Sequence, residues 1–309
     1  MSTFRKYHEI ENHYQNKIIN SFIERNPEIL NEEYVIEDKL DGSNISIVIT
    51  KDTIRWAKRS CLIADDDNFN GLQSIKHEYD TIINLLQNYV KANDIEVLQV
   101  YGEIYGDGIQ KRIKYAPGKH IRFFDIRIDG TPQTPYFLYN LFEQLNAEHL
   151  LVKVYDIVKG LDNSLTFDVN FVNDNGSYIE GVVIKPYKNN YFLPSGSRFL
   201  LKKKSDAFSE KMKGKDTQKR ENTSFRQEVL QLSNTFNTYI NENRVLSVFS
   251  KEGEITHPND IGKYIKLVLD DAKKDFLKEN ELPDNLDVKE EKFIYNVGSD
   301  VVKILKKYL

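Results

Sequence analysis

Residues 39–44 read Lys39-Leu40-Asp41-Gly42-Ser43-Asn44 and lie between two apolar runs, 34–36 and 45–49. Both runs are rich in residues that favour extended structure. Gly42 can adopt the positive φ of a tight turn, and Asn44 tolerates unusual backbone angles. The stretch therefore predicts strand, turn and strand, with a lysine at the turn. Because Asp-Gly beside a lysine is also an ordinary hairpin tip, this stretch alone leaves both a reactive and a solvated lysine open.

A lysine amine attacks phosphorus only when it is neutral. At a reference pKa near 10.4, only about one amine in a thousand is neutral at working pH. Neighbouring cations, from other lysines or a bound Mg²⁺, lower such a pKa by about two to three pH units. A reactive Lys39 therefore predicts basic residues and metal-binding carboxylates elsewhere in the chain.

Composition indicates a folded, intracellular protein. The 309 residues, 40% of them hydrophobic, suffice for a buried core and two domains. Cys61 is the single cysteine, which excludes an internal disulfide and a cysteine-based zinc site and fits the cytoplasm or another reducing compartment. No run approaches the roughly 18 apolar residues of a membrane span. We therefore expect no membrane association.

Basic residues are concentrated in one region. The net charge is −4, yet residues 198–220 hold nine Lys or Arg against three acids. Within this strip, Lys202 and Lys204 would lie on one face of a strand and Lys203 on the other. Two ammoniums on one face can bind a triphosphate, although a plain basic strand edge remains the alternative. Arg59, at the end of a predicted strand over 53–60, is either a phosphate contact or a solvated strand end.

Two acids are placed next to glycines at predicted strands. Glu103 follows Gly102, and Glu180 precedes Gly181. A glycine lets a ligand approach the backbone, and two carboxylates at strand ends can converge on one divalent cation. A pair of unrelated strand-edge acids is the alternative.

The remaining pattern predicts an α+β fold. We expect helices over 75–90 and 136–151, a buried strand over 122–126 and extended structure over 166–172. Apolar residues then recur at helical spacing in 225–240, 261–276 and 293–305. The expected architecture is a domain of strands and helices over 1–214, a linker over 215–222 and an all-α domain over 223–309.

The motifs, taken in order, resemble a known series. They are similar to the six collinear motifs of covalent nucleotidyltransferases, and read KLDGSN, AKRS, YGEIYG, FFDI, EGVVIKP and LLKKKSDAFSEK. The resemblance implies an ATP-grasp-like nucleotidyltransferase domain of antiparallel sheets with flanking helices. Further segments narrow the resemblance to the RNA ligase 2 family of phage double-stranded RNA ligases and kinetoplastid editing ligases. These are ENHY at 11–14, GDGIQK at 106–111, FSEK at 208–211 and NRVLSVFSKEGE at 243–254.

The resemblance implies a role for each matching residue. Lys39 would be the nucleophile that forms lysyl-AMP. Asn44 and Glu103 would contact the ribose, and Phe124 would stack on adenine. The remaining ATP contacts would be Asp38 and Leu40 at the base, through backbone groups, and Arg59, Lys202 and Lys204 at the phosphates. Glu180, Asp41 and Glu103 would hold Mg²⁺, for which Mn²⁺ can substitute.

The resemblance also implies an activity. It is ATP-dependent sealing of 3′-OH/5′-phosphate nicks in double-stranded RNA, or in another RNA-containing duplex, by a monomer that a phage or virus encodes. Basic residues of the tail would grip the duplex phosphates: Arg244, Lys251, Lys303, Lys306 and Lys307. Phage members often have histidine at the position of Asp41, where the wider superfamily has aspartate.

Two alternatives remain open. DNA ligases and capping guanylyltransferases share the lysine motif, but they usually carry a β-rich oligonucleotide-binding barrel after the last motif, whereas the tail here has helical periodicity. A non-catalytic RNA-binding protein on a decayed ligase fold predicts loss of a catalytic position. All seven are present: Lys39, Arg59, Glu103, Phe124, Glu180, Lys202 and Lys204.

Overall fold

The computed structural model describes residues 4–211 and 225–309, and these cluster into two compact units. The first unit holds Ile18–Ala207 with the N-terminal segment before Gln15, and the second holds the chain from Phe208 onward with Gln15–Lys17. The predicted linker over 215–222, the predicted boundary at residue 214 and part of the basic strip over 198–220 lie outside the described residues.

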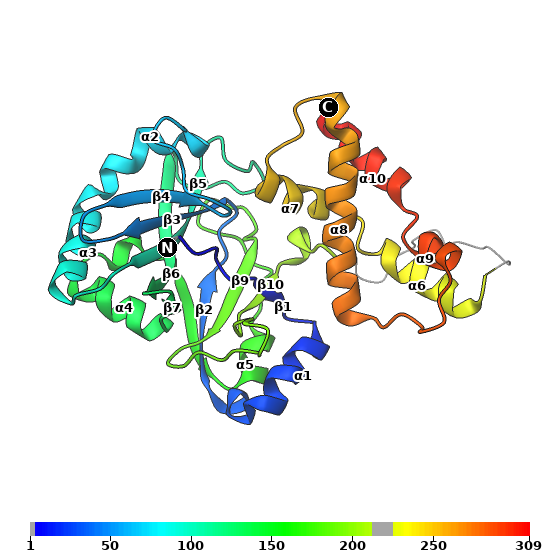
Figure 1. Ribbon diagram of the computed structural model, residues 1–309, viewed down its shortest axis with the longest axis horizontal. Helices are drawn as coiled ribbons and strands as arrows, with labels where there is room; N and C mark the ends of the chain where they lie inside the picture. The colour runs from blue at the N-terminus through cyan, green and yellow to red at the C-terminus, as the bar shows by residue number, and fades with distance from the viewer. Residues whose placement is uncertain (1–3, 212–224) are drawn as a thin grey trace. The chain divides into compact units, whose positions relative to one another are not determined.

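The described strands of the first unit form two five-stranded sheets (Figure 1). Sheet A has the order β1-β10-β9-β2-β8, and sheet B has the order β4-β3-β5-β6-β7. Pairing is antiparallel except that β1 pairs with β10 in parallel. The strands are β1 (Glu11–Asn12), β2 (Glu33–Asp38), β3 (Ser43–Ile49), β4 (Ile54–Lys58), β5 (Leu98–Gly106), β6 (Lys119–Ile128), β7 (Thr131–Pro132), β8 (Val154–Lys159), β9 (Gly181–Pro186) and β10 (Leu201–Lys204).

The turn at residues 39–42 connects the two sheets. β2 pairs with β8 and β9 in sheet A, whereas β3 pairs with β4 and β5 in sheet B. The predicted strand, turn and strand are present, but the ordinary-hairpin alternative is wrong. Gly42 is needed for close approach and not for a positive φ, because a Cβ there would lie 2.3 Å from the Ile104 carbonyl oxygen.

Helices cover each sheet and bury its apolar face. One core joins sheet B to α3 and α4, and another joins sheet A to α1 and α5. A small cluster of Tyr7, Tyr101 and Leu200 links β5 to the segment before β10, with Phe124 packed against it. The helices of this unit are α1 (Asn16–Arg25), α2 (Leu72–Ile75), α3 (Asp80–Ala92), α4 (Pro135–Gln144) and α5 (Leu161–Thr166).

Three boundaries differ from the sequence prediction. The helix expected over 136–151 ends at Gln144, and Asn146 adopts a left-handed φ of 53°. The helix expected over 75–90 begins, as α3, only at Asp80. The stretch expected to be extended, 166–172, overlaps the end of α5 at Thr166. Lys203 donates from Nζ to the Leu165 carbonyl oxygen at 2.6 Å and so satisfies an acceptor at the end of this helix.

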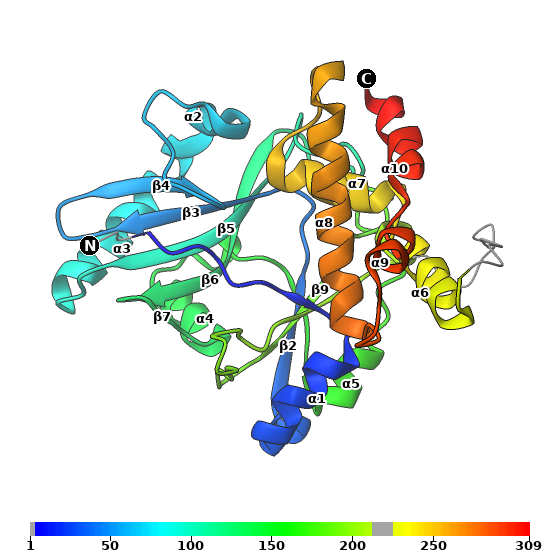
Figure 2. The ribbon, with the colours of Figure 1, turned by 45° about the vertical axis from the view of Figure 1, so that its right-hand side comes forward.

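The second unit is helical, as predicted, and α8 is its longest described element (Figure 2). Its apolar residues form one core to which each described α-helix of the unit contributes. Asn241 caps α7 through the Arg244 amide, and a capping box at Asp287 begins α9. No helix among the described residues has the length and hydropathy to cross a bilayer. The helices are α6 (Gln227–Asn237), α7 (Glu242–Glu252), α8 (Ile261–Glu279), α9 (Val288–Ile294) and α10 (Gly298–Leu305).

Candidate active site

Lys39 lies directly after β2 and faces β9. Its main-chain amide donates to the Gly181 carbonyl at 3.0 Å, and its Nζ lies 2.7 Å from Glu180 Oε1. The side chain is 21% exposed, so the amine is sheltered but reachable. The strand register, and not chance side-chain flexibility, therefore places Lys39 beside Glu180.

Glu180 binds a second ammonium from β10. Lys204 Nζ lies 2.9 Å from the same oxygen, Oε1, and the register pairs Lys204 with Gly181. A Cβ at Gly181 would lie 2.1 Å from the Lys203 carbonyl oxygen, so only glycine fits there. Lys39, Glu180 and Lys204 consequently converge from three neighbouring segments of sheet A.

Glu180 is held in its ionised form. Burial raises the pKa of this carboxyl, but the positive charges of Lys39 and Lys204 outweigh that effect and bring the pKa to about 2. The site thus contains a buried carboxylate whose charge two ammoniums compensate. Such ammoniums are suited to bind phosphate oxygens when these are supplied.

Asn44 and Glu103 lie opposite each other on β3 and β5. Burial raises the pKa of Glu103 to about 8; the positive charge of Lys39 opposes this rise, whereas the negative charges of Glu180 and Asp41 add to it. Glu103 therefore shares one electrostatic environment with Lys39 and Glu180. The two residues predicted to contact the ribose, one on each strand, are neighbours.

Phe124, on β6, is partly buried beside two groups from other segments. Its ring centroid is 5.2 Å from that of Tyr7, and Lys185 Nζ lies 5.3 Å from its ring centroid. The same Nζ donates to the Phe124 carbonyl at 2.6 Å. The ring is thus fixed through both its side chain and its backbone.

Lys185 belongs to a buried ion pair that the sequence prediction missed. Its Nζ lies 2.6 Å from Glu37 Oε2, and both side chains are 1% exposed. Tyr139 also donates to Glu37. Lys185 lies within the motif EGVVIKP, whereas Glu37 lies two residues before the motif KLDGSN. Nothing in either segment names the other as its partner.

Replacing Lys185 by methionine is expected to lower the free energy of unfolding by about 3 to 5 kcal/mol, because the Glu37 carboxylate would stay buried without its cation. Replacing both, Lys185→Met with Glu37→Gln, should recover most of this loss. Urea unfolding of the wild type and the variants measures both values. Equal losses in the single and double variants would contradict the ion-pair explanation.

The other predicted residues occupy varied surroundings. Asp38 ends β2, and burial raises its pKa to about 6 against a hydrogen bond from Tyr155. Leu40 follows Lys39 and is partly buried, and Arg59 follows β4, where its charge opposes the raised pKa of Glu103. Lys202 pairs in register with Val183. Asp41, predicted as a metal ligand, pairs with Arg112 at 2.5 Å.

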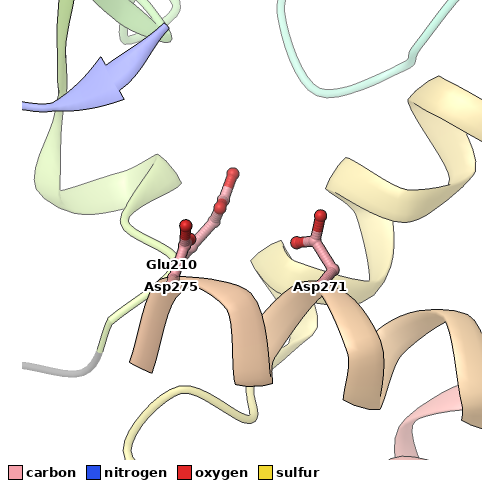
Figure 3. Close-up of side chains that lie close together, drawn as sticks. All are labelled: Glu210, Asp271 and Asp275. Carbon is pink, nitrogen blue, oxygen red and sulfur yellow. The ribbon is translucent and has the colours of Figure 1, made fainter. Parts of the chain in front are cut away.

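A cluster of three acids lies in the helical unit (Figure 3). Asp271 and Asp275 project from α8 toward Glu210. Nη1 of Arg244 lies 3.2 Å from Glu210, 2.6 Å from Asp271 and 2.7 Å from Asp275. Arg244 compensates their charge and is only 1% exposed. Its predicted contact with RNA phosphates is therefore wrong, because its guanidinium is buried among these carboxylates.

Family models match most of the chain. Residues 32–204 match the model described as RNA ligase, and residues 223–304 match the model described as T4 RNA ligase 2 C-terminal. The chain belongs to the RNA ligase family. The predicted resemblance to the RNA ligase 2 family is confirmed by the two matches together.

Solved structures of Naegleria gruberi RNA ligase are also similar. They include a lysine-to-alanine mutant with ATP and Mn (19% identity, TM-score 0.50), an apo aspartate-to-alanine mutant (18%, 0.50) and a glutamate-to-alanine mutant with AMP and Mn (19%, 0.50). Each match covers 67% of this chain but only 58%, 57% and 58% of those chains, respectively. The likeness shows that this chain shares the nucleotidyltransferase fold of the Naegleria gruberi structures.

Proposed function

We propose that the protein is an ATP-dependent RNA ligase that seals 3′-OH/5′-phosphate nicks in duplex RNA through a lysyl-AMP intermediate. The observation that carries the proposal is the convergence of Lys39 and Lys204 on Glu180. Family membership and the ATP or AMP and Mn present with the solved relatives support it.

In the first step, the neutral amine of Lys39 attacks the α-phosphorus of ATP. An N–P bond forms, the bond from phosphorus to the bridging oxygen breaks, pyrophosphate leaves, and the amine proton passes to solvent. Lys202 and Lys204 would hold the phosphates and stabilise the charge that develops on pyrophosphate. AMP would then pass to the RNA 5′-phosphate, and the 3′-hydroxyl would displace it.

The acids near Lys39 are of the chemical type that holds a divalent cation. Carboxylate oxygens are the ligands that Mg²⁺ prefers, and the charges of Glu180 and Asp41 both act on the buried Glu103. Glu180 would hold the ion, with Asp41 and Glu103 as further candidates. A bound Mg²⁺ supplies positive charge to the phosphates.

The helical second unit distinguishes among the classes of nucleotidyltransferase. In the described part of the chain after the last motif, residues 225–309, the elements are helices and no β-barrel is present. Residues 223–304 match the model described as T4 RNA ligase 2 C-terminal. This favours RNA ligation over the DNA ligase and guanylyltransferase alternatives.

Two assays test the proposal. Incubation with α-labelled ATP and Mg²⁺, followed by denaturing electrophoresis, should show label bound to the protein. A panel of nicked duplexes that differ only in which strand is RNA should show sealing where the strands at the nick are RNA. A protein that takes up no label, or that seals nicked DNA in preference to nicked RNA, would contradict the proposal.

A fragment of residues 1–214 contains all seven predicted catalytic positions and should still label itself. It should pass AMP to a nicked duplex at least about 100-fold more slowly, because it lacks helical surface that positions the duplex. Transfer by the full chain should weaken as salt rises. Sealing by the fragment at the full-chain rate would overturn this role, and an insoluble fragment would show that the tail mainly shields an apolar face.

A further inference from the structure

A loop of residues 107–117, here called the strap, leaves β5 and returns to β6. Its ends are closed by two hydrogen bonds: the Asp107 amide donates to the Gly118 carbonyl at 2.8 Å, and the Gly118 amide donates to Asp107 Oδ2 at 2.7 Å. Ile109 and Ile113 are buried and anchor its middle. The strap is therefore held at its two ends by hydrogen bonds and in its middle by buried side chains.

The strap holds Asp41 at two points. Arg112 donates from Nε to Oδ2 at 3.0 Å and from Nη2 to Oδ1 at 2.5 Å, a bidentate arrangement. The Asp41 main-chain amide donates to Tyr115 Oη at 2.8 Å. The Asp41 side chain is 3% exposed and that of Arg112 16%, so water competes little for these bonds. Both the side chain and the backbone of Asp41, two residues after Lys39, are fixed.

The strap also reaches the segment that leads to Glu180. The Lys114 amide donates to Ser177 Oγ at 3.1 Å, and Asn173 Nδ2 donates to the Lys114 carbonyl at 3.0 Å. One loop therefore ties the turn that carries Lys39 to the segment that carries Glu180, its partner.

We propose that Arg112 and Tyr115 are positioning residues for Lys39, acting through Asp41 and not by contact with the nucleotide. The inference rests on the proposed role of Lys39. Loss of the bidentate bond would leave Asp41 as a buried carboxylate without its cation and free the turn to move. Displacement of a nucleophile by about 1 Å can cost about 100-fold in rate.

The test compares Arg112→Gln, Arg112→Lys and Tyr115→Phe with Arg25→Gln, a matched control at an exposed arginine in α1. Arg112→Gln should lower kcat for self-adenylylation about 10- to 100-fold and leave KM for ATP within about threefold. Arg112→Lys should recover little, because lysine cannot bridge both oxygens. A 10- to 100-fold rise in KM for ATP at unchanged kcat would instead show that Arg112 contacts the nucleotide, and would overturn the proposal. The proposal would also fail if the variant and the wild type had equal kcat once the rates are corrected for the fraction of folded protein.

A second readout needs no ATP. Modification of Lys39 by an amine-reactive acetylating reagent, followed by peptide mass spectrometry, should change at least about threefold in Arg112→Gln relative to wild type, with surface lysines as internal reference. If Lys39 reactivity changes while the wild type forms no adenylate, positioning stands and the proposed function fails. If the wild type forms adenylate and the variant matches it in both measurements, the positioning role fails.

Discussion

Replacing Lys39 by alanine should abolish transfer of label from α-labelled ATP to the protein, a loss of at least about 1,000-fold. In the proposed reaction, the side chain of Lys39 supplies the atom that bonds to phosphorus, and its amine lies 2.7 Å from Glu180. Lys188→Ala is the matched control, because Lys188 is an exposed lysine paired with Glu33. Undiminished labelling of the Lys39 variant would place the nucleophile elsewhere.

The same variant permits a sharper test. If Lys39 serves only to carry AMP, RNA that already bears AMP on its 5′-phosphate bypasses the first step. Lys39→Ala should then still seal a nick made with pre-adenylylated RNA when ATP is absent. Failure of this step, in a variant whose thermal unfolding matches the wild type, would show that Lys39 also takes part in strand joining.

Glu180→Gln should lower self-adenylylation by about 100-fold or more. The amide keeps the shape of the carboxylate but lacks the charge that orients the ammoniums of Lys39 and Lys204 and that would bind Mg²⁺. Because the pKa of Glu180 is about 2 in the wild type, the carboxylate is ionised throughout the assay range.

The Glu180 prediction is measured across a series of Mg²⁺ concentrations, with Glu33→Gln as control at an exposed, paired acid. If Glu180 is a metal ligand, the rate of the variant should rise less steeply with Mg²⁺ concentration than the rate of the wild type. Raised Mg²⁺ should still restore part of the lost rate. Activity equal to the wild type at every concentration would remove Glu180 from the site.

The sequence could predict features that depend on residues close together in the chain. The α+β fold and helical tail followed from periodicity, and so did the placement of Lys202 and Lys204 on one strand and of Glu180 at the start of another. The roles of these three residues stay predictions. The bonds of Arg112 and Tyr115 to Asp41 were not, because they join residues far apart in sequence. Lys185 and Glu37 were missed for the same reason, since neither segment alone shows that it is the other's partner.

Some sequence patterns are compatible with two structures. Two apolar runs around a turn suit a hairpin as well as a crossover between sheets, and only the pairing of β2 and β3 with other strands decides between them. The position of Arg244 in a helical tail predicts an exposed cation. In the structure, three acids from other positions surround its guanidinium.

The parallel pairing of β1 with β10 has a consequence for the emerging chain. Glu11 and Asn12 lie beside Leu201 and Lys202, so the first and last described strands of the sheet must meet. Contacts so distant in sequence form late, because a long loop has to close first. A ribosome must therefore release nearly the whole sheet-forming part before Lys202 and Lys204 take their places. The proposed binding of nucleotide phosphates by these two lysines therefore requires that the synthesis of that part is nearly complete.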